Sequence, residues 1–103
     1  MLIVNTEAVS GKKIEHLGIV KGSMIQSKHL GRDIMSGLKS IVGGELRGYS
    51  EMLNEARATA TRRMVEEAKG MGADGIVNLR YATSAVMQGA AEILVYGTAV
   101  KFV

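Results

Sequence analysis

Two histidines are the strongest candidate metal ligands in this chain of 103 residues, which contains no cysteine. His16 and His29 match none of the short spacings, such as His-x3-His, that place two imidazoles on one helix face. A transition-metal site usually takes about three or four ligands from Cys, His, Asp or Glu. One subunit is therefore a poor site, but a ring of subunits repeats each histidine around an axis and could assemble one. The alternative for each is an ordinary surface or hydrogen-bonded histidine.

A second set of residues is suited to binding a small anion or polar ligand. Arg57 lies beside the predicted inner face of a long helix, where its guanidinium could clamp a carboxylate or phosphate. Otherwise it bonds backbone carbonyls or an acid across a subunit boundary. Alternation along a predicted strand places Asn78, Arg80 and Ser84 on one face. In the interior of a ring this polar stripe could bind a ligand, whereas at a rim it is only solvated.

The sequence predicts no catalytic residues. Serine, aspartate and histidine occur, but no motif such as Gly-x-Ser-x-Gly joins them. The adjacent Glu66 and Glu67 fall on different faces of the predicted helix. Gly43 and Gly44 precede that helix and could hold an anion through free N–H groups. No phosphate-binding lysine motif follows them, so a plain turn is the alternative. We therefore expect a non-enzymatic protein.

The elements that must position these residues follow from the periodicity of apolar side chains. The pattern predicts a long helix, a shorter helix before it and four strands. The predicted ranges are 44–71 for the long helix, 29–42 for the short one, and 2–9, 14–25, 75–86 and 92–102 for the strands. A short connection separates the last two strands, which predicts an antiparallel hairpin.

The long helix has a predicted inner face of small and flexible residues, which allows a helix to pack close to a sheet. These residues are Tyr49, Leu53, Ala56, Ala60, Met64 and Ala68. Gly70 and Gly72 predict the C-terminal cap of this helix. Gly18 and Gly22 share one face of the second strand, which indicates a bulge or a second backbone passing close by. Contact with a subunit or ligand is the alternative.

Composition limits the class of protein. Apolar residues make up 47% of the chain but aromatic residues only 4%, so the core must be aliphatic. Both faces of the predicted strand 92–102 are largely apolar, and each needs a cover. The long helix covers one face, and a second copy of the chain is the simplest cover for the other.

The net charge of +3 comes from scattered basic residues without aromatic stacking platforms, so we do not expect nucleic-acid binding. The first residues lack the basic and long apolar stretches typical of a secretory signal, and no apolar run approaches the ~20 residues that span a bilayer. We expect a soluble, cytoplasmic protein with no membrane partner.

An ordered set of short segments resembles the YbjQ family, which is labelled as heavy-metal-binding. The resemblance extends from Ile3 to Val100. It is carried by Val42-Gly43-Gly44, Tyr49, Glu55-Ala56-Arg57, Met64, Ala68, Gly72-Ala73-Asp74-Gly75-Ile76-Val77 and Tyr96-Gly97-Thr98-Ala99-Val100. It implies a dodecin-like α+β domain with an antiparallel sheet packed on a long helix. It also implies a ring-shaped homo-oligomer, with five subunits as the expected number.

These observations predict a single YbjQ-like domain over 1–103. Its predicted fold is a two-layer α+β structure in the order β-β-α-α-β-β, in which an antiparallel sheet packs on one long helix plus a short helix. We expect a non-enzymatic homo-oligomeric ring, a pentamer, that binds a small ligand or ion between subunits through Arg57, Asn78, Arg80 and Ser84. The alternative is a heavy-metal-binding module that uses His16 and His29 across subunits, with a divalent metal ion as cofactor.

Overall fold

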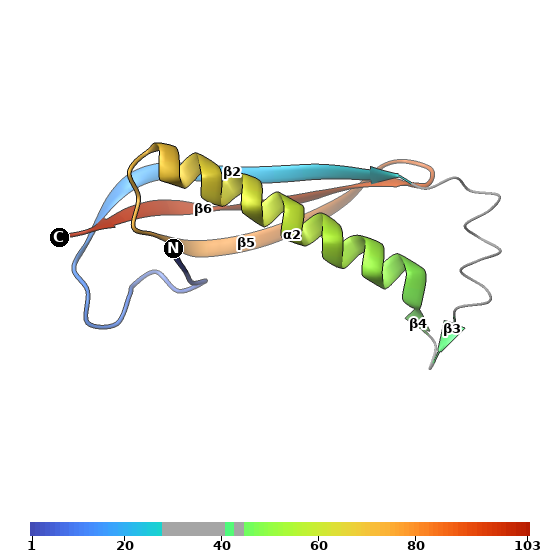
Figure 1. The fold of residues 1–103 in the computed structure, drawn as a ribbon, viewed down its shortest axis with the longest axis horizontal. Coiled ribbons are helices and arrows are strands. Elements are labelled where there is room, and N and C mark those ends of the chain that lie inside the picture. The colour runs from blue at the N-terminus through green and yellow to red at the C-terminus, as the bar shows by residue number, and fades with distance from the viewer. Residues whose placement is uncertain (28–40, 43–44) are drawn as a thin grey trace.

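The computed structural model describes residues 1–27, 41–42 and 45–103. In these residues, one long helix lies along one face of a four-stranded sheet (Figure 1), and a two-stranded ribbon precedes the helix. The helix is α2 (Arg47–Gly70). The sheet contains β1 (Leu2–Ile3), β2 (Ile14–Ser27), β5 (Gly75–Met87) and β6 (Ala90–Phe102), and the ribbon contains β3 (Ile41–Val42) and β4 (Glu45–Leu46). The α+β class is therefore confirmed.

The sheet is mixed rather than purely antiparallel, with strand order β1-β5-β6-β2. β6 pairs antiparallel with both neighbours, as predicted for the hairpin, but β1 pairs parallel with β5. The prediction of an antiparallel sheet is wrong at this pair, because β1 spans only two residues and its partner cannot be read from periodicity. The predicted short helix lies largely outside the described residues, and its last two positions, Ile41 and Val42, form β3.

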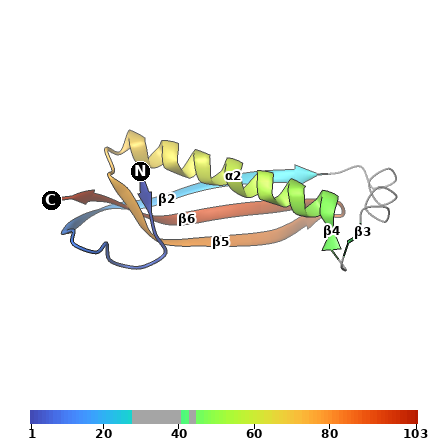
Figure 2. The ribbon, with the colours of Figure 1, turned by 60° about the horizontal axis from the view of Figure 1, so that its bottom comes forward.

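The core lies between α2 and the two strands β2 and β6. Four residues of the predicted inner face of α2 are completely buried, namely Ala56, Ala60, Met64 and Ala68. They pack against buried residues of the sheet, among them Val20, Ile93, Val95 and Ala99. Figure 2 shows β2, β6 and β5 side by side with α2 crossing above them. The prediction of a small-residue inner face is confirmed.

Glycine at position 22 allows this close packing. A Cβ atom there would overlap the backbone of Ala60 and Met64. The second backbone that was predicted to pass close to β2 is therefore this chain's own helix. The predicted bulge is also present, because the pairing of β2 with β6 shifts between His16 and Gly18, where Gly18 has φ 141°.

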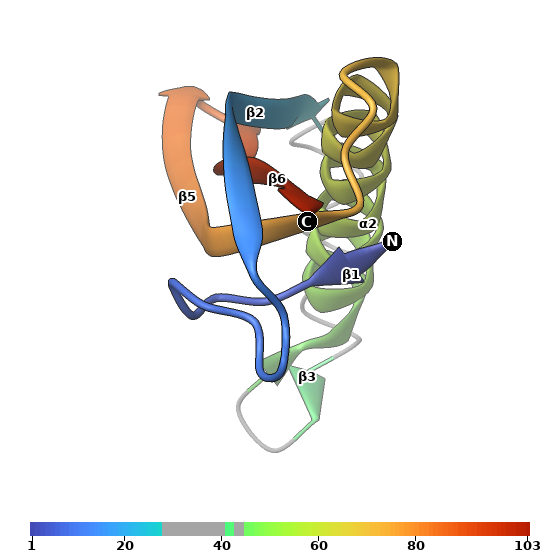
Figure 3. The ribbon, with the colours of Figure 1, turned by 90° about the vertical axis from the view of Figure 1, so that its left-hand side faces the viewer.

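β5 has a corresponding irregularity. Its register with β6 shifts between Val77 and Arg80, so β5 contains one extra residue, and Asn78 adopts a left-handed backbone with φ 55°. An extra residue bends a strand and breaks the alternation of its side chains. Figure 3 shows β2 and β5 each turning a corner.

A left-handed glycine and a backbone hydrogen bond cap the C-terminal end of α2. α2 ends at Gly70, and Gly72 has φ 77°, the conformation that glycine favours after a helix. The amide of Ala73 then donates to the carbonyl of Ala68 at 3.1 Å.

Among the described residues, no helix combines the length and apolar character needed to cross a bilayer.

Candidate functional site

The second half of β5 is exposed on both faces. We call residues Arg80–Met87 the β5 arm, and every one of them is exposed. The helix packs mainly on β2 and β6, as Figure 3 shows from the end of the molecule. Of the β5 arm, Tyr81 reaches α2, where its hydroxyl lies 2.9 Å from Thr61 Oγ1. β1 pairs only with Gly75 and Ile76. In the part of the chain that the structure describes, the outer edge of the β5 arm therefore has no neighbouring strand.

The sheet face opposite α2 also lacks a cover along the part of the strands that runs toward the β5–β6 turn. We call this face the open face. Because Gly22 faces α2, the neighbouring Lys21 and Ser23 point to the open face. Large apolar side chains lie on it: Ile19 is 76% exposed and Ile25 is 62% exposed. Exposed apolar side chains gathered on one face of a sheet are typical of a binding or assembly surface.

Strand register aligns polar and aromatic residues in rows across the open face. Lys21 of β2 pairs with Tyr96 of β6, and Tyr96 pairs with Arg80 of β5. Directly opposed residues of antiparallel strands point to the same face. Two cations thus flank one tyrosine, which is 41% exposed. We call these three residues the basic row.

The backbone holds the side chain of Arg80. Its Nη1 donates to the carbonyl oxygen of Asn5 at 3.0 Å and to that of Leu79 at 2.9 Å. A guanidinium has five N–H donors. No acceptor for Nε or Nη2 lies in the described part of the chain, so these donors can serve a ligand.

The structure brings together only part of the predicted polar stripe. Arg80 and Ser84 share the open face, since they pair with Tyr96 and Glu92 of β6. Asn78 lies at the extra residue of β5, and its backbone N–H donates to the carbonyl oxygen of Thr6 at 2.9 Å. Alternation therefore does not align Asn78 with the other two.

The remaining predicted residues lie elsewhere. Arg57 is exposed on α2, and its Nη1 donates to Asn54 Oδ1 at 3.0 Å, a contact within one helix turn. His16 is exposed near the start of β2, and His29 lies outside the described residues.

Sequence reasoning missed Lys21 and Tyr96 as partners of Arg80. Their types were visible, but their alignment depends on the register of three strands and on the extra residue in β5. It also missed Arg63, whose Nη1 donates to the carbonyl of Ser23 at 2.7 Å. This contact ties α2 to the edge strand β2.

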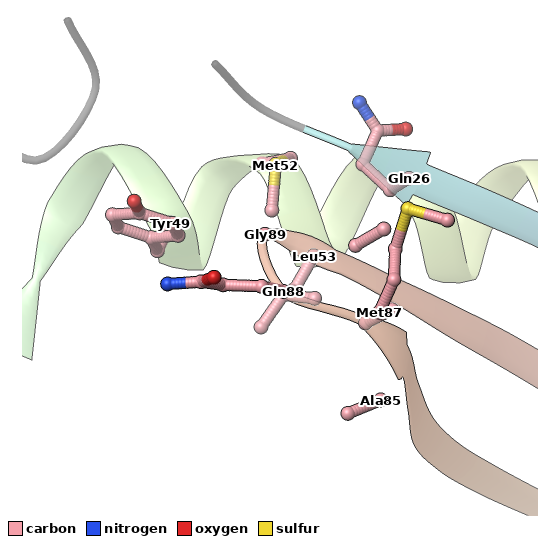
Figure 4. A pocket seen from close by; sticks show the side chains of 10 residues that line it. Gln26, Tyr49, Met52, Leu53, Ala85, Met87, Gln88 and Gly89 are labelled. Atoms are coloured by element: carbon pink, nitrogen blue, oxygen red, sulfur yellow. The ribbon is translucent and has the colours of Figure 1, made fainter. Parts of the chain in front are cut away.

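A pocket of about 350 Å³ lies where the β5–β6 turn meets the first turns of α2 (Figure 4). Its wall is mainly apolar. The lining residues are Gln26, Tyr49, Met52, Leu53, Ala85, Met87, Gln88, Gly89, Ala90 and Ala91. Two of them, Met52 from α2 and Met87 from the β5 arm, carry thioethers, which are soft metal ligands.

The described residues contain no group of three or more His, Cys, Asp or Glu side chains close enough to hold a metal ion. A site of imidazoles and carboxylates within these parts of one subunit therefore does not fit. The thioethers of Met52 and Met87 line one pocket and are donors of a type that suits a soft metal.

A four-stranded mixed sheet carrying one long helix defines a small α+β domain. The chain belongs to the YbjQ family: residues 1–103 match the family described as "Putative heavy-metal-binding". The predicted resemblance is thus confirmed over the whole chain.

Similar proteins from several organisms carry the name UPF0145, which denotes the same family. A UPF0145 protein of Alkaliphilus metalliredigens is 70% identical over 103 residues, and the alignment covers 100% of both chains. One from Clostridium novyi is 67% identical over 101 residues, which are 98% of each chain. One from Methanosarcina acetivorans is 63% identical over 102 residues, covering 98% of this chain and 96% of the relative.

A crystal structure of a protein of unknown function from Pediococcus pentosaceus, of the DUF74 family, has the same fold. Its TM-score is 0.68, with 17% sequence identity and coverage of 100% of this chain and 98% of that one. At this identity the likeness concerns the fold alone.

Proposed function

We propose that the protein is a non-enzymatic homo-oligomer, a closed ring in which the β5 arm of each subunit docks on the next subunit and a small ligand binds between subunits. The observation that carries the proposal is the exposure of the β5 arm on both faces and along its outer edge. An unpaired strand edge is a ready template for pairing with another chain. Tyr81, Val86 and Met87 add exposed apolar surface to this arm.

The dimensions of the subunit support assembly. Its radius of gyration is 16.8 Å, against about 13 Å for a compact domain of about 100 residues. Its accessible surface is 6703 Å², against roughly 5,600 Å² for a folded monomer of this size. The extra surface is what a subunit offers to its neighbours.

The difference between the two sheet edges favours a ring. One exposed edge is the β5 arm, and the other is β2, a different strand with a different sequence. Contact between two different surfaces is heterologous, and a heterologous contact closes into a ring when the rotation permits. Five subunits is the number that the family resemblance implies.

Native mass spectrometry of the untagged protein, purified without chelators, tests the proposal. We expect a single multiple of the subunit mass, with additional mass from the ligand. Ala82→Lys places a charge on the open face of the β5 arm and should shift the mass to that of the monomer. Ala58→Lys makes the same change at an exposed site on α2 and should leave the assembly intact. A wild-type monomer, or equal assembly of both variants, would refute the ring.

The second candidate function is binding of a soft metal ion, favoured by the family description and by the two thioethers in one pocket. We expect Ag⁺ to bind with a stoichiometry that Met52→Leu and Met87→Leu each reduce. Met71→Leu replaces a methionine that does not line this pocket and is the control.

The histidine alternative requires a separate measurement. If several subunits share His16 or His29, the double variant His16→Ala/His29→Ala should lose stoichiometric Zn²⁺, measured by elemental analysis of the assembled protein. Unchanged metal content would remove the histidines from consideration.

A further inference from the structure

We propose that the basic row, Lys21–Tyr96–Arg80, is a binding site for a nucleoside monophosphate, with the phosphate held by the two cations and the base stacked on the tyrosine. The inference rests on the proposed ligand-binding function and names the class of its ligand. All three residues belong to one subunit, and Arg80 lies on the β5 arm, beside the proposed contact with the next subunit; ligand binding and assembly are measured separately.

The spacing of the strands sets the size of the site. Neighbouring strands lie roughly 4.8 Å apart, so the backbones of Lys21 and Arg80 are separated by about 10 Å with Tyr96 between them. Both outer side chains are long and exposed. Arg80 is held at the outer side of β5 by its contacts with Asn5 and Leu79, so Lys21 is the side chain that reaches across Tyr96 to bridge a phosphate to it.

Among the described residues, no acid neutralises the two cations. No carboxylate among the described residues pairs with Lys21, and the contacts of Arg80 are to backbone carbonyls. Those contacts use Nη1 and leave the Nε–Nη2 edge of the guanidinium, which matches a phosphate with two parallel hydrogen bonds. Charge complementarity therefore selects an anion.

Tyr96 adds recognition of an aromatic base. No cation of the described residues lies over the ring of Tyr96; the cation–ring pair found there is Lys12 over Phe102, at 5.4 Å. An exposed aromatic ring offers a stacking platform for any base. Inorganic phosphate would use only the cations, and a nucleoside only the ring, so a nucleotide uses the whole row.

Isothermal titration calorimetry with AMP, adenosine and inorganic phosphate tests the site, with native mass measured on each sample. We expect AMP to bind at least about tenfold more tightly than either fragment, with an affinity that falls as salt is added. Lys21→Gln should weaken AMP binding about tenfold, as expected for one charge-assisted hydrogen bond, and leave adenosine unaffected. Lys69→Gln removes a positive charge from the last turn of α2 and should change nothing.

The tyrosine is tested with two variants. Tyr96→Leu should weaken AMP binding but not phosphate binding, and Tyr96→Phe, which keeps the ring, should bind AMP like the wild type. Because Lys21 and Tyr96 are exposed, these variants should fold. An assembled wild-type protein that gives no heat with AMP, or Lys21→Gln with unchanged affinity, would overturn the inference. A monomer that binds AMP with the expected pattern would support it while refuting the ring.

Discussion

The contact of Gly22 with α2 determines how large the inner side chains of the helix can be. With no Cβ at position 22, the helix backbone approaches the strand at Ala60 and Met64. Small residues on one surface thus require small residues on the other. The consequence is a helix–sheet interface with little tolerance for added volume.

Ala60→Leu should lower the free energy of unfolding by ~1–3 kcal/mol, because overpacking forces side chains and backbone to shift. Ala58→Leu makes the same change on the exposed side of α2 and should have a small effect. Urea unfolding followed by circular dichroism measures both. An Ala60→Leu protein as stable as the Ala58→Leu protein would show that the buried face of α2 is assigned wrongly.

Residue types alone led to part of the candidate site. Arg80 and Ser84 were predicted because strand alternation held across them, whereas Asn78 lies at the extra residue, where alternation fails. Lys21 and Tyr96 could not be added from the sequence, since a row across strands requires the register of each pair. That register depends on long-range pairing, which local pattern does not encode.

The ends of α2 show what can be predicted at the scale of an element. The predicted helix, 44–71, differs from the observed Arg47–Gly70 by a residue at the C-terminus, where glycine marks the end clearly. The strands of the hairpin were similarly well predicted from alternation and a short turn. The parallel pairing of β1 was not, because two residues contain no periodicity.

The two glycines at the end of α2 should respond oppositely to alanine. Gly72 has φ 77°, so Gly72→Ala should destabilise the fold by about 1 kcal/mol. Gly70 is the last helical residue, and a Cβ there would meet no atom. Gly70→Ala should therefore be neutral or stabilise by up to about 1 kcal/mol. Thermal unfolding compares the two, and an equal loss in both variants would contradict the assignment of the cap.

At the scale of the whole molecule, the β5 arm should distinguish assembled from free subunits. Within Arg80–Met87, the amides that point toward β6 are paired inside one subunit, so only the outward-pointing amides report on assembly. If a neighbouring subunit pairs with the outer edge, these outward amides should exchange slowly with deuterium in the wild-type protein. In Ala82→Lys they should exchange rapidly. The amides of Ile93–Val100 in β6 are paired on both sides within one subunit and provide the internal reference. Rapid exchange of the arm in an assembled protein would mean that assembly uses another surface.

The need for a second copy was predicted from the two apolar faces of β6, and it remains a prediction. Sequence pattern indicates that a face requires a cover, but it cannot identify the cover or the number of copies. Those depend on the shape of the finished subunit, including the corners at Gly18 and Asn78.

The strand order has a consequence for biosynthesis. β6 is the last strand in chain order, yet it lies between β5 and β2. While the ribosome is still translating β5, the newly made β2 has no strand to pair with, and α2 has only part of its platform. The sheet can close only after β6 has left the exit tunnel. A chain interrupted before Ala90 therefore carries an unpaired β2, and an unpaired strand edge of this kind favours aggregation.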